Sequence, residues 1–447
     1  MRPWWRATLG SVALAGVAAC APYAAYRGPV PAPGASLALA TSRDSRPGPA
    51  ANPGSSRTAS APLQPAGTDR AHHYLGTLAL PAGAESLIVV LYGDNRPGYR
   101  IESRGVELAA VRHLSWRPTT WLGLLFVPVL LVEAIVPTLD GPRDLITLFT
   151  HRPAGGREKA VLKSIQRMQE AGLVVSLGDV VTDGRRGRLW EDYAARHAPL
   201  RERVLTLATP GNHERLFSEV ARDSWDAVIG PPAAPERYWC AFDVPEAQTR
   251  FVFLDSNVLT DRRSQYPDSL ENVLAEEQLA WADSILDSSI RYKLVLFHHP
   301  LVSAGHHVAD WAPERPARRR ERLLEICARR GVTAVITGHE HVYQRLYLRT
   351  KDGGFWHITT GGGGSPLYRI PHRAWREAMD RPLPAGVSLE RGSELLEAEH
   401  HICRLALPRD RPSNSGRSLP FEVRRVFARG GTRLIETLDL AQPPSRQ

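Results

Sequence analysis

The chain has 447 residues, of which 43% are hydrophobic and 23% are charged, so it can bury the core of a globular protein. Its formal net charge of +9 comes mostly from arginine. The basic residues form no stripe with aromatic residues between them, so we expect a solvated basic surface that attracts anionic lipid or substrate, and no nucleic-acid partner.

The first 20 residues have the pattern of an export signal. Arg2 and Arg6 precede the apolar stretch Ala7–Val17. The following tetrad, Val17-Ala18-Ala19-Cys20, is similar to the lipobox of bacterial lipoproteins, in which the cysteine is lipidated and becomes the mature N-terminus. This resemblance implies a lipid anchor at Cys20 in the cell envelope, and Ala21 is typical of outer-membrane sorting. The alternatives are a plain secretory signal and an uncleaved anchor.

Two further segments fall outside the pattern of a globular domain. Residues 21–72 are rich in Pro, Ala, Gly, Ser and Arg, which predicts a flexible tether. The run Trp121–Pro137, inside an apolar insertion at 101–150, carries one charge, Glu133, and is interrupted by Pro128. It is interpreted as a buried helical hairpin, as a membrane-dipping segment that assists the lipid anchor, or as a transmembrane span.

Three cysteines remain in the body of the chain: Cys240, Cys327 and Cys403. Their spacing is not that of a metal site, and Cys327 falls on the apolar face of a predicted helix. We expect buried thiols, with a Cys240–Cys403 disulfide as the alternative in an oxidising compartment.

Apolar strand-like runs alternate with helical patterns, which predicts an α/β fold. The runs are Leu87–Leu91, Leu173–Leu177, Val204–Ala208, Lys293–Phe297 and Val332–Thr337. The predicted helices are Glu158–Ala171, ending at Gly172, then Leu274–Leu286, and Arg320–Arg330, ending at Gly331. Antiparallel strands are expected at 398–441, over His400–Leu407, Phe421–Ala428 and Thr432–Leu440, with a hairpin turn at Arg429-Gly430-Gly431.

A polar group follows each of the five runs. Because open α/β sheets bind ligands beyond the carboxyl ends of their strands, we expect these groups to share one rim. They are Asp94, Asp179, Asn212, His298, His339 and His341. Carboxylate, carboxamide and imidazole groups in this combination suit a pair of metal ions.

The surrounding motifs resemble those of the calcineurin-like metallophosphoesterases over about residues 85–370. In chain order they are Gly93-Asp94, Gly178–Gly184, Gly211-Asn212-His213-Glu214, His298-His299-Pro300 and Gly338-His339-Glu340-His341. Phe253–Asn257, Gln278–Trp281 and Gly361–Gly364 look like the branch that includes purple acid phosphatases. The resemblance implies that residues 73–447 form a four-layer α/β/β/α sandwich with mixed sheets and a metal site at the strand ends.

The resemblance also assigns ligands to two metal ions. One ion would take Asp94, Asp179 and His341, and the other would take Asp179, Asn212, His298 and His339. Mn, Fe, Zn and Co all suit this mixture of oxygen and nitrogen donors.

Four other histidines near the motifs have different expected roles. His213 matches the family histidine that binds phosphate and protonates the leaving group, oriented by a nearby carboxylate. His299 should point away from His298 and act as a packed or hydrogen-bonded residue. His306 or His307 would be the outer histidine that purple acid phosphatases use to contact substrate, with a surface role as the alternative.

The chain departs from the family pattern at two places. Many relatives have Asp-x-His at the first motif, whereas this chain has Asp94-Asn95-Arg96. Thr182 stands where purple acid phosphatases have a metal-binding tyrosine. Water or Asn95 would complete the shell of the first metal, and Arg96 either holds a phosphate oxygen pair or forms a surface ion pair.

The resemblance thus implies metal-dependent hydrolysis of phosphate mono- or diesters in the cell envelope. The alternatives are a phosphate- or metal-binding protein that kept the fold without turnover, and a membrane-structural protein dominated by Trp121–Pro137. Nothing in the sequence identifies the physiological substrate.

Overall fold

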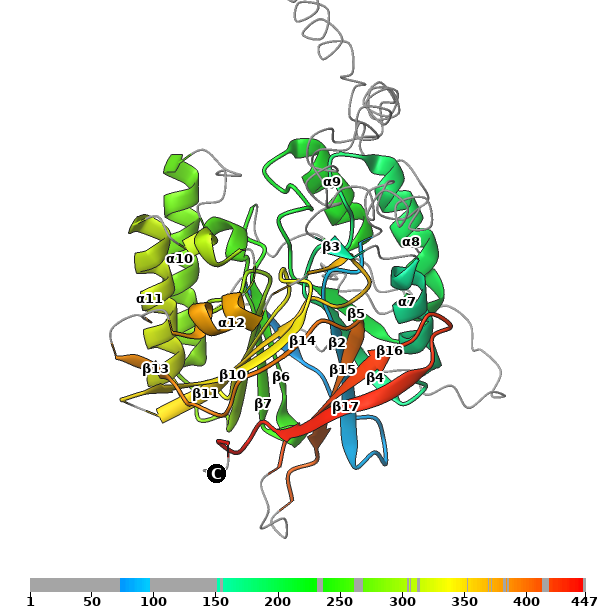
Figure 1. The fold of residues 1–447 in the computed structure, drawn as a ribbon. Helices are drawn as coiled ribbons and strands as arrows, with labels where there is room; N and C mark the ends of the chain where they lie inside the picture. Colours follow the sequence, from blue (N-terminus) through cyan, green and yellow to red (C-terminus); the bar gives the residue numbers. More distant parts are fainter. Residues whose placement is uncertain are drawn as a thin grey trace, which may run out of the picture.

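The computed structural model describes residues 73–96, 151–152, 156–230, 236–260, 268–303, 305, 307–311, 314–351, 353–368, 370, 372–380, 383, 386–411 and 418–444. Two β-sheets occupy the middle of this part, and helices cover the outer face of each sheet (Figure 1). The architecture is mixed α/β, with two mixed sheets in four layers, as the sequence predicts.

The first sheet has six strands in the order β17-β16-β15-β2-β4-β5. Its parallel part consists of β2 (Ser86–Tyr92), β4 (Ala171–Ser176) and β5 (Leu205–Ala208). The C-terminal strands continue it in antiparallel pairs: β15 (His401–Pro408), β16 (Pro420–Val426) and β17 (Thr432–Asp439). Gly430, at φ +79°, lies in the turn between the last two strands, where the sequence predicts a hairpin.

The second sheet has nine strands, with β7, β8, β9 and β11 parallel at its centre. In spatial order its strands are β1 (Tyr74–Thr77), β6 (Cys240–Val244), β7 (Thr249–Phe253), β8 (Tyr292–Phe297), β9 (Ala334–Thr337), β11 (Gly353–Thr360), β10 (Tyr343–Thr350) and β13 (Val387–Leu389), with β14 (Leu395–Glu397) also pairing with β10. A separate pair joins β3 (His151–Arg152) to β12 (Leu367–Tyr368).

Within the described ranges, three helices lie beside each sheet. On the side of the six-stranded sheet lie α7 (Arg157–Arg167), α8 (Gly187–Arg201) and α9 (Glu219–Val228). On the side of the nine-stranded sheet lie α10 (Asp268–Leu286), α11 (Glu314–Arg329) and α12 (His372–Met379). Short 3₁₀ turns are η1 (Pro245–Ala247), η2 (Ser256–Val258) and η3 (Val308–Trp311).

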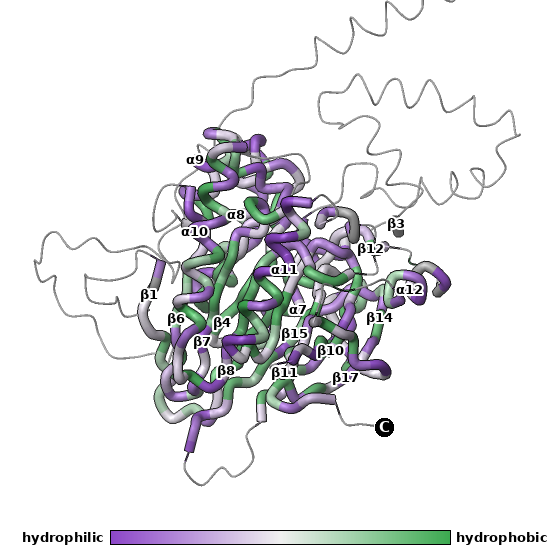
Figure 2. Tube along the Cα trace, turned by 90° about the vertical axis from the view of Figure 1, so that its left-hand side faces the viewer, coloured by the Kyte–Doolittle hydropathy of each residue, from purple (hydrophilic) through white to green (hydrophobic). Residues whose placement is uncertain are grey.

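The core follows from side chains that alternate between the two faces of each strand. In β2, Leu87, Val89 and Leu91 belong to the cluster between the two sheets, which also contains Leu294 and Ile336 from the other sheet. The intervening Val90 and Tyr92 pack with α7 instead. Figure 2 shows the corresponding hydrophobic strands in the interior of the described part.

The five predicted strands are divided between the two sheets: β2, β4 and β5 belong to the first sheet and β8 and β9 to the second. One prediction about these elements needs correction. Helix α7 ends at Arg167, and Gly172 lies in β4 instead of capping the helix. A Cβ on Gly172 would lie 2.5 Å from Leu87 Cδ1, so close packing of the strands explains this glycine.

The predicted end of the later helix is confirmed. Gly331, at φ +63°, follows α11, and the N–H of Val332 donates to the carbonyl of Cys327 at 2.9 Å. This is the expected C-terminal cap by a left-handed glycine.

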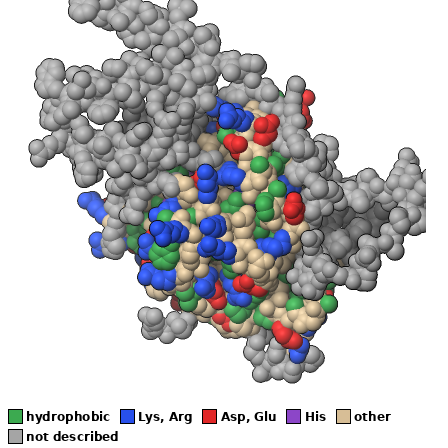
Figure 3. Space-filling view, turned by 90° about the vertical axis from the view of Figure 1, so that its right-hand side faces the viewer, with side chains coloured by type: hydrophobic (Ala, Val, Ile, Leu, Met, Phe, Trp, Pro, Cys, Tyr) green, Lys and Arg blue, Asp and Glu red, His purple; other side chains and the backbone are tan. Residues whose placement is uncertain are grey.

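The predicted signal peptide, the tether and the run Trp121–Pro137 lie outside the described residues. Within the described ranges, no helix combines the length and apolar character needed to cross a bilayer. Cys240, Cys327 and Cys403 are free thiols, with Cys327 and Cys403 buried and Cys240 partly exposed. Figure 3 shows many Lys and Arg side chains on the side of α7 and α8, where α7 exposes Lys159, Lys163 and Arg167.

Candidate metal centre

The six predicted metal ligands follow strands of both sheets. Asp94, Asp179 and Asn212 come after β2, β4 and β5 of the six-stranded sheet. His298 follows β8, and His339 and His341 follow β9, in the nine-stranded sheet. The site is therefore built where the carboxyl ends of the two sheets meet, and each sheet supplies half of the side chains.

Short backbone contacts hold these strand ends together. The N–H of Asp94 donates to Gly178 O at 3.0 Å, and the N–H of His339 donates to Asp94 Oδ2 at 2.8 Å across the two sheets. Gly178 has φ +91°, and a Cβ there would lie 2.7 Å from both Gly211 N and His298 Nδ1. This motif glycine is thus required by close approach as well as by backbone conformation.

Three of the predicted ligands have left-handed backbone conformations. The φ angles are 59° for Asp94, 54° for Asp179 and 69° for His339. Such a conformation costs a non-glycine residue about 1–3 kcal/mol, and it persists only where the surroundings enforce it. The strain is concentrated at the carboxylates and the imidazole that point into the centre.

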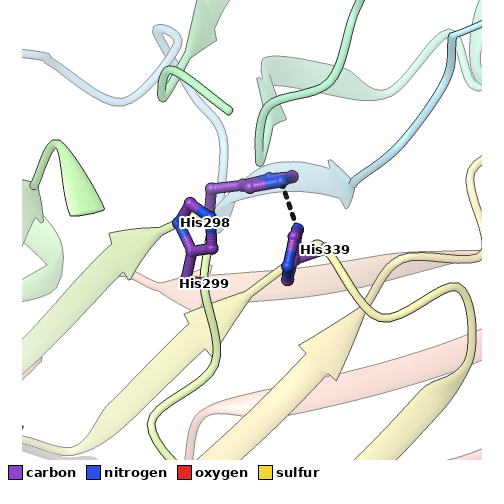
Figure 4. Close-up of side chains that lie close together, drawn as sticks. All are labelled: His298, His299 and His339. Carbon is purple, nitrogen blue, oxygen red and sulfur yellow. Dashed lines mark hydrogen bonds between the residues drawn. The ribbon is translucent and has the colours of Figure 1, made fainter. Parts of the chain in front are cut away.

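The first group of donor atoms contains His298, His339, Asn212 and Asp179. His298 Nε2 lies 3.0 Å from His339 Nδ1, 3.1 Å from Asn212 Oδ1 and 3.4 Å from Asp179 Oδ1. Figure 4 shows the His298 and His339 rings turned toward one another. We call these four residues the His298 group.

The outer hydrogen bonds of the two rings determine where their protons lie. His298 Nδ1–H donates to Leu177 O at 2.7 Å, and His339 Nε2–H donates to Asp310 Oδ2 at 2.8 Å. A neutral imidazole has one N–H, so the two nitrogens that face each other carry lone pairs. Burial, followed by the nearby histidine charges, lowers the pKa of His339 well below its usual value. Two facing lone pairs beside an amide oxygen and a carboxylate fit a metal cation.

The second group of donor atoms contains Asp94, Asp179 and His341, whose potential ligand atoms all lie within 4.8 Å of one another. His341 Nδ1–H donates to Pro366 O at 2.6 Å, which leaves the Nε2 lone pair facing Asp94 Oδ1 at 3.3 Å. Burial, with Arg96 as the next cause, lowers the pKa of His341 to about 3. Asp94 Oδ1 is buried without a hydrogen-bond partner. These atoms, the Asp94 group, also suit a positive charge.

Arg96 lies inside the site and not on the surface. Its side chain is 6% exposed, and Nε is 3.6 Å from Asp179 Oδ2. The surface ion pair considered from the sequence is therefore wrong. Burial raises the pKa of Asp179, but the charges of His298, His213 and Arg96 bring it below its usual value.

Asn95 is buried, and its side-chain Oδ1 has no hydrogen-bond partner, so the metal-binding role considered from the sequence stays a prediction. Its side-chain NH₂ donates to the carbonyls of Glu158, at 3.1 Å, and of Gly363. Asn95 thus connects the segment after β2 to α7 and to the glycine-rich segment Gly361–Gly364.

His213 lies beside the same centre, with Nε2 3.9 Å from Asp179 Oδ2. Its Nδ1–H donates to the backbone carbonyl of Thr182 at 2.6 Å, so a carbonyl orients the ring and not the expected carboxylate. Burial, followed by Arg96, lowers the pKa of His213 to about 3. Any proton that His213 exchanges with a bound molecule must therefore sit on Nε2.

The predicted outer histidines differ in their placement. His306 lies outside the described residues. His307 belongs to the centre: its ring centroid is 3.9 Å from that of His339, and its Nε2 lies 2.8 Å from the Tyr368 hydroxyl. His299 is hydrogen-bonded to Ser256 Oγ at 2.8 Å, as expected, but its ring also approaches His339 to 4.3 Å. The expected opposite orientation to His298 is wrong, because β8 ends at Phe297 and the chain bends there.

The sequence did not reveal several residues that shape the centre. Asp310 on η3 accepts the His339 proton, and Tyr368 stacks on His341 at 4.5 Å between ring centroids. Glu340 accepts from Ser303 Oγ at 2.9 Å and His307 N at 2.7 Å, fixing the loop that leads to η3. Only Glu340 had a sequence signal, since it lies between the two motif histidines.

Glu214 supports the loops that carry Asp179 and Asn212. Its carboxylate accepts the backbone N–H groups of Asp179, Val180 and Gly211 at 2.9, 2.9 and 2.6 Å. Burial and the charge of Asp179 raise the pKa of Glu214 to about 8, while these amide donors act in the opposite direction. Glu214 is thus a structural support under the centre.

Comparison with known proteins agrees with this geometry. Residues 140–343 match the family model of the calcineurin-like phosphoesterases. Residues 140–343, slightly less than half of the chain, are thus similar to this family. Members of the family bind metal ions, and the match includes Asp179, Asn212 and the three histidines predicted as ligands. Asp94 and Arg96 lie before it. A search of curated proteins found no match.

Solved structures show distant similarity. The purple acid phosphatase PPD1 from yellow lupin (Lupinus luteus) seeds is 15% identical, with a TM-score of 0.48, over 82% of this chain and 58% of that one. GAP50, the anchor in the inner membrane complex of Plasmodium, is 14% identical, with a TM-score of 0.40, over 80% of this chain and 89% of that one. The phosphopantetheinyl hydrolase PptH of Mycobacterium tuberculosis is 13% identical, with a TM-score of 0.28, over 53% of this chain and 91% of that one. The chain thus spans less than two thirds of the lupin protein.

Proposed function

We propose that this protein hydrolyses phosphate esters in a metal-dependent reaction. The observation that carries the proposal is the convergence of lone pairs from His298, His339 and His341 on the buried carboxylates Asp94 and Asp179. Imidazole and carboxylate donors suit Mn, Fe, Zn or Co. When bound, such a cation supplies positive charge that attracts phosphate and lowers the pKa of water.

The site has two adjacent positions for positive charge, and Asp179 belongs to both. Asp179 Oδ1 faces the His298 group, while Oδ2 faces Arg96. Asn212 contributes a neutral oxygen, so the donors bring few negative charges and the loaded site stays attractive to an anion. Arg96 places N–H donors and a fixed charge beside this position, where they can hold phosphate oxygens.

His213 is the proposed proton donor to the leaving group: burial keeps the ring neutral before substrate binds, and the negative charge of a bound phosphate would favour the proton on Nε2 that is donated. Because its Nδ1 is committed to Thr182 O, Nε2 is the atom that faces the centre. The His307 ring packs against His339 and the Tyr368 ring against His341, and the two side chains would contact the remainder of the ester. These roles concern only side chains that border the donor groups.

The substitution Asp179→Asn tests the proposal. Since Asp179 serves both positions, we expect the variant to lose most of its bound metal and at least about 10³-fold of its activity on p-nitrophenyl phosphate. Asp192→Asn is the matched control, because Asp192 is exposed on α8, and it should behave as wild type. Near-normal turnover by folded Asp179→Asn would overturn the assignment.

The N-terminal sequence supports a proposal about location. The charged start, the apolar stretch and Val17-Ala18-Ala19-Cys20 favour a lipid-anchored protein of the cell envelope, in the outer membrane. We expect Cys20→Ser to move the protein from the detergent-requiring fraction to the soluble envelope fraction. A variant that stays membrane-bound would argue for attachment through the segment around Trp121–Pro137.

A further inference from the structure

We propose that the guanidinium of Arg96 permanently takes the place of one of the two cations, so that the protein binds a single metal ion in the His298 group. The inference rests on the proposed function, since it concerns the same site. It changes the expectation from a pair of metal ions to one metal ion and one built-in organic cation.

The two carboxylate oxygens of Asp179 face different groups, one the proposed metal position and the other the guanidinium of Arg96. Oδ1 lies 3.4 Å from His298 Nε2, a nitrogen whose lone pair is directed into the site. Oδ2 lies 3.6 Å from Arg96 Nε, and the neutral His213 ring is the next group, with Nε2 at 3.9 Å. A carboxylate placed between two cations would have one oxygen directed at each. Here the partner on the second side is a guanidinium that the chain itself supplies.

The backbone fixes Arg96 in this place. The N–H of Gly363 donates to Gly93 O at 2.9 Å, and that of Ser365 donates to Asp94 O at 3.0 Å. Ser365 Oγ donates to the carbonyl of Arg96 itself at 3.3 Å. Hydrogen bonds from residues 363–365 therefore hold the segment of Arg96 in place, and the 6% exposure of its side chain shows that this side chain is directed inward.

The chemistry of arginine works against a metal ion in the Asp94 group. A guanidinium is always charged and has no lone pair, so it cannot replace the histidine of an Asp-x-His motif as a ligand. It also repels a divalent ion held by the same buried carboxylates, and this repulsion is little screened in the interior. The Asp94 group keeps three potential ligands, Asp94, Asp179 and His341, but the guanidinium of Arg96 would supply its positive charge in place of a metal ion.

The arrangement remains suited to phosphate. One divalent ion together with the guanidinium exceeds the negative charge of Asp94 and Asp179, so the site remains cationic. The guanidinium adds planar N–H donors that match a pair of phosphate oxygens. Arg96 would thus neutralise substrate charge without requiring a second metal ion.

The first measurement is the metal content of the full chain. Protein stripped with a chelator is dialysed against Mn²⁺ alone, and the bound metal is counted by mass spectrometry. We expect one ion per chain in the wild type, with the electron paramagnetic resonance spectrum of an isolated Mn²⁺. Arg96→Lys, which keeps the charge, should also bind one. Two ions per chain in the wild type, or none, would overturn the inference.

Substitutions then test the cause. Arg96→His should bind two Mn²⁺ ions and give a spin-coupled spectrum, while Arg96→Gln should bind a second ion at least about 100-fold more tightly than the wild type does. His298→Gln should remove the single ion of the wild type but leave one ion in the Arg96→His background. If folded Arg96→His and Arg96→Gln both remain at one ion, Arg96 does not exclude the second.

The same samples separate this inference from the proposed function. Hydrolysis of p-nitrophenyl phosphate by a protein with two ions would overturn the inference alone. One ion per chain without hydrolysis would support the inference and contradict the proposed function.

Discussion

His298 Nε2 and His339 Nδ1 lie 3.0 Å apart, and with both rings neutral each presents a lone pair to the other. Hydrogen bonds on the far side of each ring fix this arrangement. The N–H of His298 donates to Leu177 O, and the N–H of His339 donates to Asp310. Two hydrogen-bond acceptors at this distance repel unless a cation or a proton lies between them. The protein therefore maintains a cation-binding geometry through residues that need not touch the cation.

This relationship gives Asp310 a positioning role. Asp310→Asn should weaken Mn²⁺ binding by about 10–100-fold, since partners behind ligand histidines orient the ring and raise its basicity. Asp287→Asn, at an exposed carboxylate paired with Arg330, is the control and should leave affinity unchanged. Isothermal titration with Mn²⁺ compares the two. Equal affinity of Asp310→Asn and wild type would show that His339 is oriented without Asp310.

His213 should matter most for substrates with poor leaving groups. We expect His213→Ala to keep its metal but to slow hydrolysis of an alkyl phosphate by about 10²–10⁴-fold, because the alkoxide needs a proton. A nitrophenolate leaves without such help, so p-nitrophenyl phosphate should lose much less. The comparison requires kcat on both substrates with the metal content measured. An equal loss on both would contradict proton donation by His213.

The helical layer over the nine-stranded sheet contains a buried ion pair. Arg319 on α11 donates to Glu271 Oε1 of α10 at 2.7 Å and to Val258 O at 3.0 Å. Arg319→Leu leaves the Glu271 charge buried and should lower the free energy of unfolding by about 3–5 kcal/mol. Arg322→Leu breaks an exposed pair between the same helices and should cost under about 1 kcal/mol. Urea unfolding measures both, and equal losses would contradict the assigned difference.

His357 should make stability depend on pH. Its buried Nε2 accepts the N–H of Leu301 at 3.1 Å, and burial lowers the pKa of His357 to about 3. Between that value and about 6.5 the unfolded chain binds a proton that the folded chain excludes. The stabilisation is therefore complete above about pH 6.5 and is lost as the pH falls toward 3.

The substitution His357→Gln removes this titration but keeps an acceptor for Leu301. Between pH 7 and 4.5 we expect the wild type to lose about 2–3 kcal/mol more of its unfolding free energy than the variant does. Urea unfolding in the presence of a chelator gives the comparison without a contribution from metal binding. Parallel pH profiles would show that another group is responsible.

The sequence predicts the positions of these strands well, for a physical reason. Apolar runs such as Leu173–Leu177 are typical of strands buried on both faces, and the polar groups that follow them lie where the carboxyl ends of the two sheets meet. Phe253–Asn257 and Gln278–Trp281 proved structural: Gln278 binds the backbone of Asp255 through both its side-chain oxygen and nitrogen, at 2.7 and 2.9 Å. The apolar runs alone do not show which strand belongs to which of the two sheets, because all of the runs are similarly apolar.

The remainder of the site depends on distant contacts. Asp310 reaches His339 from a short turn that has no periodic pattern of its own, and Tyr368 reaches His341 from β12. The direction of Arg96 follows from hydrogen bonds between its segment and residues 363–365, more than 260 positions away. None of these pairings leaves a signal in local spacing.

Metal removal and restoration is the most direct test of phosphoester hydrolysis at this centre. Chelator-treated wild-type protein would be assayed on p-nitrophenyl phosphate and on bis-p-nitrophenyl phosphate, before and after addition of Mn²⁺, Fe²⁺, Zn²⁺ or Co²⁺, beside Asp179→Asn. We expect stripped protein to be at least about 10³-fold less active, and one of the ions to restore wild type but not the variant. Hydrolysis that survives removal of the metal, or a metal-loaded wild type inactive on both esters, would contradict the proposed function.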